Sequence, residues 1–221
     1  MRAREISELA RRADVTAGVS VLDVCCGVAG PGRFLTRDLG CTYFGVDSSA
    51  SAIQIARALA RGLPCRFEVS DVPPLPTSTF DVVLLLETML AFADKAALIE
   101  AVARVLPVGG RFAFTLEEGA PLTDSERDRM PDADTVWLTP LRELEPVLSR
   151  HGLAVRWQDD WSDSHRAMAD ALRAAFAADA DSISSVIGRP ALDDLLESHA
   201  RWSQWLAAGR VRKLAVVAER V

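Results

Sequence analysis

The chain contains little lysine and no surplus of positive charge. Lysine occurs only at Lys95 and Lys213, so arginine supplies nearly all of the 25 basic residues among 221. We interpret this scarcity as a compositional bias. The 31 acidic residues give a net charge of −6. Binding to a phosphate backbone needs basic patches, so the balance of charge predicts no nucleic-acid partner.

Cysteine is also scarce, and its spacing excludes the usual zinc motifs. The four cysteines form no CxxC pair, and adjacent Cys25 and Cys26 cannot bridge without strain. We therefore expect no metal site and a reducing compartment. Residues 1–14 are charged and lack the apolar core of a signal peptide. No apolar run approaches the ~20 residues that span a bilayer. These absences predict a cytoplasmic protein without a membrane partner.

Strand-like and helical patterns alternate through the first two thirds of the chain. Several of the apolar segments lack polar alternation, as expected of strands buried on both faces. This order predicts an α/β fold with a doubly wound, mostly parallel sheet. The predicted strands are Val19–Cys25, Thr42–Asp47, Cys65–Ser70, Phe80–Glu87 and Gly110–Glu117. The predicted helices between them are Pro31–Leu39, Ser49–Arg61 and Asp94–Leu106.

The last third departs from this rhythm. A helix is predicted at Leu141–Arg150, and strands at Leu153–Gln158 and Lys213–Glu219. Nearly all of residues 162–208 is helical in pattern, which is too long for a plain crossover. Ligands bind at the carboxyl edge of such sheets. We therefore predict one domain, 1–221, in which residues 160–210 form a helical cap over that edge.

The most informative stretch is VLDVCCGVAGPGRF, residues 21–34. An apolar strand carrying Asp23 leads into a turn with Gly27, Gly30 and Gly32, where a helix begins. A strand, a tight turn and a helix N-terminus present backbone N–H groups at the carboxyl edge of a parallel sheet. Small residues let a ligand approach the main chain closely. The stretch predicts a nucleotide-like cofactor site.

Two acidic positions narrow the choice of cofactor. Asp47 ends the second strand, at a distance from the turn that suits an acidic residue holding ribose hydroxyls. That feature fits both NAD and S-adenosylmethionine. The turn lacks the GxGxxG spacing, so a dinucleotide pyrophosphate has no evident place. Asp71 and Val72 follow the third strand, where an acidic residue can receive an adenine amino group. These features favour S-adenosylmethionine.

Six segments, taken together and in their order along the chain, resemble the motifs of the class I S-adenosylmethionine-dependent methyltransferases. They are VLDVCCGVAGPGRF, FGVD, SDVPPLP, FDVVLLLE, LPVGGRFAF and KLAVVAE. The stretch LLLETMLAFADK, residues 84–95, is similar to the small-molecule branch that includes tocopherol and natural-product methyltransferases. The resemblance implies a Rossmann-like fold of seven strands, the last antiparallel, and S-adenosylhomocysteine as product. The cofactor-binding residues that it implies are Asp23, Cys25, Gly27, Asp47, Ser48, Asp71, Val72 and Glu87.

The chain departs from that family at three positions. Cys25 and Ala29 stand where glycine is usual, and Ala91 stands where the branch often has histidine. A side chain at Cys25 crowds the methionine end of the cofactor. The base expected at position 91 is absent.

Three residues are candidates for catalysis: Glu87, Glu117 and His165. A carboxylate at the carboxyl end of a central strand, as at Glu87, is costly unless it is paired or functional. The alternative for Glu87 is an ion pair with a nearby arginine. Strand alternation predicts that one of Glu117 and Glu118 faces the pocket. His165 begins the cap and could act as a base, or could pack within the cap helix.

The predicted function is methyl transfer from S-adenosylmethionine to an oxygen or nitrogen of a small organic acceptor. One alternative is a cofactor-binding protein of the same fold without methyl transfer. A less favoured alternative is a nicotinamide-dependent oxidoreductase. The sequence leaves open the identity of the acceptor and whether the protein forms a homodimer.

Overall fold

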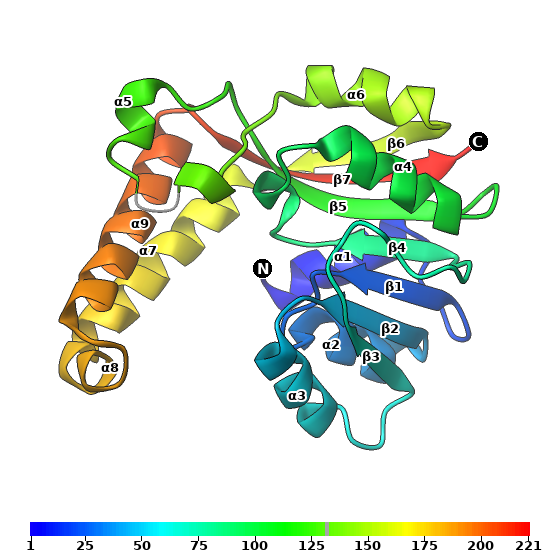
Figure 1. The fold of residues 1–221 in the computed structure, drawn as a ribbon, viewed down its shortest axis with the longest axis horizontal. Helices are drawn as coiled ribbons and strands as arrows, with labels where there is room; N and C mark the ends of the chain where they lie inside the picture. Colours follow the sequence, from blue (N-terminus) through cyan, green and yellow to red (C-terminus); the bar gives the residue numbers. More distant parts are fainter. Residues whose placement is uncertain (131–132) are drawn as a thin grey trace.

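A seven-stranded sheet organises the computed structural model, which describes residues 1–130 and 133–221 (Figure 1). The strand order is β3-β2-β1-β4-β5-β7-β6. Neighbours among β1 to β5 run parallel, whereas β7 is antiparallel to both β5 and β6. The predicted fold class is therefore confirmed. The strands are β1 (Ser20–Val24), β2 (Thr42–Asp47), β3 (Cys65–Val69), β4 (Val82–Leu85), β5 (Arg111–Glu118), β6 (Leu153–Asp160) and β7 (Arg212–Arg220).

Helices cover both faces of the sheet. One apolar core joins the sheet to α1, α2 and α3, and a second joins it to α4 and α6. Side chains alternate accordingly along β1: Leu22 and Val24 belong to the second core and Val21 to the first. The helices are α1 (Ala3–Arg12), α2 (Gly30–Leu39), α3 (Ala50–Leu59), α4 (Lys95–Val105), α5 (Asp124–Arg127), α6 (Leu141–Arg150), α7 (Ser162–Ala178), α8 (Ala180–Ile187) and α9 (Arg189–Ala207).

Local chemistry explains where several of these elements begin and end. The side chains of Ser49 and Asp94 accept hydrogen bonds from the first turns of α3 and α4. The prediction for β4, Phe80–Glu87, was too long at both ends. The N–H of Phe80 donates to the carbonyl of Val105 outside the sheet, and Glu87 has a left-handed backbone with φ 64°. The bond of Phe80 lies outside the sheet and the backbone of Glu87 is not extended, so the strand includes neither residue.

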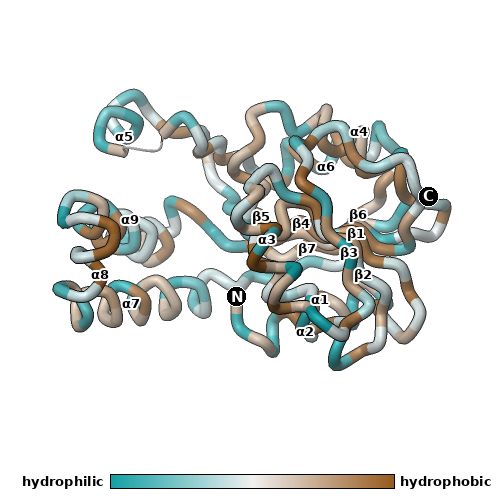
Figure 2. The backbone as a smooth tube through the Cα atoms, turned by 60° about the horizontal axis from the view of Figure 1, so that its bottom comes forward, coloured by the Kyte–Doolittle hydropathy of each residue, from teal (hydrophilic) through white to brown (hydrophobic). Residues whose placement is uncertain are grey.

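The segment predicted to be nearly all helical, residues 162–208, forms three helices, and the last two are separated at Gly188. Helices α7 and α9 lie side by side and extend away from the carboxyl edge (Figures 1 and 2). Few of their side chains are buried: Ala169, Leu192 and Leu206. This arm, residues 162–207, begins where β6 ends. Its action as a cap stays a prediction.

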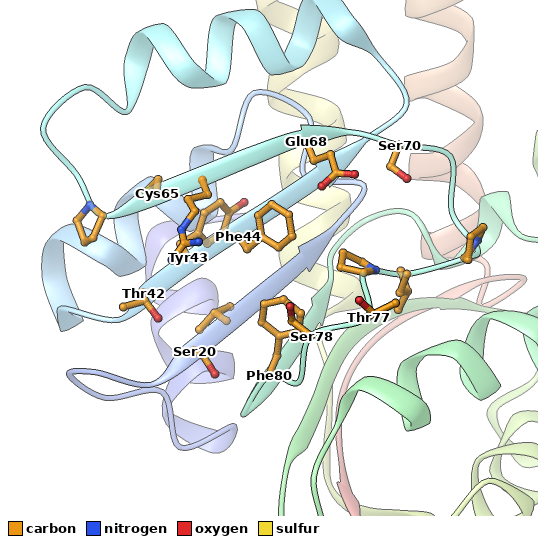
Figure 3. A pocket seen from close by; sticks show the side chains of 16 residues that line it. Ser20, Thr42, Tyr43, Phe44, Cys65, Glu68, Ser70, Thr77, Ser78 and Phe80 are labelled. Carbon is orange, nitrogen blue, oxygen red and sulfur yellow. The ribbon is translucent and has the colours of Figure 1, made fainter.

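Among the described residues, no helix covers one part of the sheet. The connection from β3 to β4 contains Pro73, Pro74 and Pro76 and forms no helix. A hollow of about 790 Å³ lies against β1, β2 and β3 there (Figure 3). The rings of Phe44 and Phe80 stack within it, with centroids 5.9 Å apart. This sheet-face hollow runs along the strands, whereas the candidate site lies at their carboxyl ends.

None of the described helices combines the length and the apolar character that crossing a bilayer requires.

Candidate functional site

The carboxylate of Asp47 ties together the turns that follow β1 and β2. The N–H of Gly27 donates to its Oδ2 at 2.7 Å, and the N–H of Ser49 donates to its Oδ1 at 2.9 Å. Ser48 lies exposed between the two turns. The structure thus places Gly27, Asp47 and Ser48, three of the residues predicted to bind the cofactor, close together. Each carboxylate oxygen keeps a further lone pair that can accept a hydroxyl.

Asp23 is buried on β1, with 2% of its surface exposed. The hydroxyl of Tyr43 donates to its Oδ2 at 2.6 Å. Burial raises the pKa of Asp23 to about 7, although the bond from Tyr43 opposes that rise. The partner of this carboxylate is thus a hydroxyl on the neighbouring strand β2. A Cβ at Gly32 would lie 2.0 Å from the Tyr43 ring, so glycine is required there.

Two residues of the turn adopt a conformation that favours glycine. Cys25 has φ 59° and Ala29 has φ 56°. These are the two positions where the resemblance expects glycine, and the backbone supplies the physical reason. Burial raises the pKa of the Cys25 thiol to about 11. A neutral thiol is a poor nucleophile, so Cys25 is a lining residue and takes no part in covalent chemistry.

We expect Cys25→Gly to stabilise the protein and to open the cofactor site. Glycine adopts the left-handed region without the penalty that a Cβ brings, so the change removes about 1–2 kcal/mol of strain. The melting temperature should rise by about 2–8 °C, and S-adenosylhomocysteine should bind several-fold more tightly. Thermal unfolding and calorimetric titration measure both effects. Cys65→Ala, on β3, is the control. Weaker binding by Cys25→Gly would refute the crowding that we ascribe to Cys25.

A cavity of about 460 Å³ lies beside this turn. It extends from the glycine turn to the residues that follow β4. A Cβ added at Gly27 or Gly30 would meet nothing within 4 Å, so the main chain there is open to a ligand. The cavity is lined by Met1, Ile6, Asp23, Cys25, Cys26, Gly30, Pro31, Leu86 and Glu87.

Glu87 connects this cavity to a cluster of charged side chains from four elements. Glu87 follows β4, Glu117 lies on β5, Lys213 on β7, and His165 in the first turn of α7. The Nζ of Lys213 donates to Oε1 of Glu117 and lies 3.0 Å from Oε1 of Glu87. The Nδ1 of His165 is 3.8 Å from Oε2 of Glu87. The structure therefore brings together the three residues predicted separately as catalytic candidates.

Lys213 is the member that the sequence interpretation missed. The alternative weighed for Glu87 was an arginine partner, but the observed partner is this lysine. Lys213 is 1% exposed and Lys95 is 7% exposed. The Nζ of Lys95 donates to the carbonyls of Phe92 and Trp137. Both lysines are thus buried and bonded. The sequence contains only these two lysines, and we interpreted their scarcity as a compositional bias. That scarcity could instead have identified Lys213 as a candidate residue of the site.

The environment of Glu87 stabilises its ionised form. Burial raises the pKa of Glu87, but the charge of Lys213 and the hydrogen bond from it, together with His165 when that ring is protonated, outweigh burial and bring the pKa below its ordinary value. The N–H of Glu87 donates to Oγ1 of Thr115 at 2.7 Å, which fixes the left-handed turn. The Oε2 of Glu117 is buried and has no hydrogen-bond partner among the described residues. That oxygen can accept a bond from a ligand.

His165 is held in its neutral form. Burial is the main cause that lowers its pKa, and the charge of Lys213 adds to it. The carboxylates of Glu87 and Glu117 oppose this effect without reversing it. A neutral imidazole can accept a proton, as a general base must.

The same geometry bears on metal binding. Ligand atoms of Glu87, Glu117 and His165 all lie within 4.8 Å of one another, which suits a metal ion. The ammonium of Lys213 already contacts both carboxylates, so it supplies the positive charge that an ion would bring. The chemistry of this set favours an internal cation, and the absence of a metal site stays a prediction.

The remaining predicted residues lie nearby or turn outward. Asp71 is exposed and Val72 packs against the core beside α4, both in the loop after β3. Their contact with adenine stays a prediction. Glu118 turns away from Glu117 as alternation predicted, and it pairs with Arg212.

Comparison with known proteins identifies relatives of this chain. Residues 21–110 match the family described as "Methyltransferase domain". Methyltransferase GfsG of Streptomyces halstedii is 38% identical over 117 residues, which are 50% of this chain and 42% of that protein. A probable chloroplastic tocopherol O-methyltransferase of Oryza sativa is 32% identical over 119 residues, 51% of this chain and 33% of that protein. The chain spans less than half the length of these two relatives.

A solved structure extends the likeness over nearly the whole fold. The [4+2]-cyclase SpnF superimposes with a TM-score of 0.81 at 24% identity, covering 98% of this chain and 80% of that one. At this identity the match concerns the fold alone. It includes the sheet and the helices that follow it.

Proposed function

We propose that the chain is a class I S-adenosylmethionine-dependent methyltransferase that transfers a methyl group to an oxygen or nitrogen of a small organic acceptor. The match of residues 21–110 to the methyltransferase family and the likeness to Methyltransferase GfsG support this. The observation that carries the proposal is the junction at Glu87. This residue lines the cavity beside the glycine turn and also belongs to the charged cluster. A cofactor in the cavity and an acceptor at the cluster would therefore meet there.

The residues of the turn suit S-adenosylmethionine. The carboxylate of Asp47 would hold the ribose hydroxyls, and the open main chain at Gly27 and Gly30 would receive the methionine part. Asp71 and Val72 would bind adenine, and Cys25 would lie beside the sulfur. When bound, the cofactor supplies a methyl group that its sulfonium has already activated.

The cluster then holds and deprotonates the acceptor. Oε2 of Glu117 would accept a hydrogen bond from a hydroxyl or amine of the acceptor. His165 would take the proton released from a hydroxyl, whereas an amine can enter neutral and needs less help. Most of the rate enhancement would come from keeping the nucleophile in line with the methyl group. The name of the rice relative, a probable tocopherol O-methyltransferase, supports a small-molecule acceptor.

The arm and the surface complete the proposal. We take residues 160–210 as a cap that shields the acceptor, because this segment places His165 beside Glu87. The net charge of −6 disfavours nucleic acid as a substrate. A cytoplasmic location fits the predicted reducing compartment.

His165→Ala should lower turnover at least about tenfold and leave the affinity for S-adenosylhomocysteine unchanged. The assay follows transfer of a labelled methyl group from S-adenosylmethionine to a panel of small hydroxyl and amine compounds, with calorimetry for the affinity. His199→Ala is the matched control, since the ring of His199 packs on Phe176 within the arm. Unchanged turnover in His165→Ala would remove His165 from the mechanism.

A second candidate is cofactor binding without methyl transfer. It is supported by the fold shared with a protein named a [4+2]-cyclase, and by alanine at position 91. Such a protein would bind S-adenosylhomocysteine and transfer label to no compound of the panel. A nicotinamide-dependent oxidoreductase would bind NAD instead, which the same calorimeter tests.

A further inference from the structure

We propose that Lys213 is a positioning residue that keeps His165 neutral and fixes the two carboxylates of the acceptor site, an inference that rests on the proposed function. Lys213 is buried on β7 and lies directly opposite Glu117 in the antiparallel register with β5. Its Nζ contacts both Glu117 and Glu87. Lys213 would touch neither cofactor nor acceptor and would act through its neighbours.

The charges around Lys213 support this role. A buried ammonium is costly unless it is paired, and here two carboxylates pair with it. Their negative charges outweigh burial and raise the pKa of Lys213, so it stays charged. One cation between two carboxylates holds both in fixed positions, and leaves Oε2 of Glu117 free to accept a bond.

The charged groups that face His165 come from four elements. They are Glu87 after β4, Glu117 on β5, Lys213 on β7 and the amino group of Met1 before α1. Burial and the two positive groups disfavour the imidazolium, whereas the two carboxylates favour it. Removing the charge of Lys213 leaves the carboxylates less opposed. The pKa of His165 should then rise.

The main chain of Lys213 also positions His165. The N–H of Lys213 donates to Oγ of Ser162 at 2.9 Å, and its carbonyl accepts from the N–H of Trp161 at 2.7 Å. These two bonds fix the start of α7. His165 follows within the first turn, and its N–H donates to the carbonyl of Trp161 at 2.9 Å. The same residue of β7 thus sets both the place of the imidazole and the charge beside it.

The decisive experiment is an NMR titration of the histidine rings in the full chain, with Lys213→Met compared to wild type. It needs neither cofactor nor acceptor. We expect the His165 signal to titrate at higher pH in the variant than in wild type. Turnover near neutral pH should fall about tenfold and recover at alkaline pH, because the base must lose its proton first. Lys95→Met, which removes the other buried lysine, should change neither the titration of His165 nor the pH dependence of turnover.

Two outcomes would overturn the proposal. One is a folded Lys213→Met protein in which His165 titrates as in wild type. The other is found in wild type itself, so it does not depend on a variant that folds. With ¹⁵N-labelled lysine only two Nζ signals are expected. Lys95 should lose its proton near pH 8, because burial lowers its pKa to about 8. If Lys213 also lost its proton there, it could not act on His165 by charge.

The result is separable from the proposed function. Failure to bind S-adenosylhomocysteine would refute the methyltransferase proposal, whereas the histidine titration would still test the effect of Lys213 on His165.

Discussion

Asp47→Ala will weaken the binding of S-adenosylhomocysteine by about a hundredfold or more. The carboxylate of Asp47 accepts from the N–H groups of Gly27 and Ser49, so its loss releases both turns. Hydrogen bonds to a charged group contribute about 1.5–3 kcal/mol each, and two of them correspond to at least about a hundredfold in affinity. Loss of the bond to ribose would add to this. Calorimetric titration measures the change.

Asp81→Ala is the matched control for this variant. Asp81 also uses its carboxylate to tie two segments, accepting from the N–H and the hydroxyl of Ser20 at 2.8 and 2.6 Å. It does so at the opposite, amino edge of β1. We expect Asp81→Ala to lower stability and to keep the affinity. Equal losses of affinity in the two variants would mean that Asp47 acts only by supporting the fold.

Glu117→Leu and Lys213→Met will each destabilise the protein by about 3–5 kcal/mol, and the double variant will recover most of that loss. Glu117→Leu leaves the buried Lys213 with Glu87 as its remaining partner, and Lys213→Met leaves Glu117 buried without its cation. Removing both leaves an apolar contact of similar size beside the less buried Glu87. Glu117 and Lys213 are 4% and 1% exposed, so water screens neither. Urea unfolding of the four proteins gives the coupling free energy.

The exposed pair of Glu100 and Arg104 on α4 provides the comparison. These residues lie one turn apart at the surface, so Glu100→Ala should change the free energy of unfolding by no more than about 1 kcal/mol. If the penalties of Glu117→Leu and Lys213→Met simply add in the double variant, the two side chains do not depend on each other for stability. The arrangement proposed for the acceptor site would then be wrong.

Most of the fold could be predicted from sequence because its signals are local. Apolar strands between helical patterns, and glycine after α2, mark the elements within a few residues. The errors lie where tertiary contacts end a strand: β4 stops at Leu85 because Glu87 turns back to bond Thr115. A run of apolar residues contains no sign of that turn.

The site was predictable residue by residue, but its geometry was not. Glu87, Glu117 and His165 each had a reason to face the carboxyl edge. Their meeting depends on the register of β5 with β7, which places Lys213 opposite Glu117. Likewise, the bond from Tyr43 to Asp23 joins two strands. Pairings between distant segments leave no periodic pattern in one sequence, so the lysine at their centre was missed.

A crystal structure of the chain with S-adenosylhomocysteine tests the central claim most directly. We predict the ribose hydroxyls on the carboxylate of Asp47 and the sulfur in the cavity between Cys25 and Glu87, facing His165. A ligand bound instead in the sheet-face hollow beside Phe44 and Phe80, or a sulfur directed away from Glu87 and His165, would contradict the proposed site.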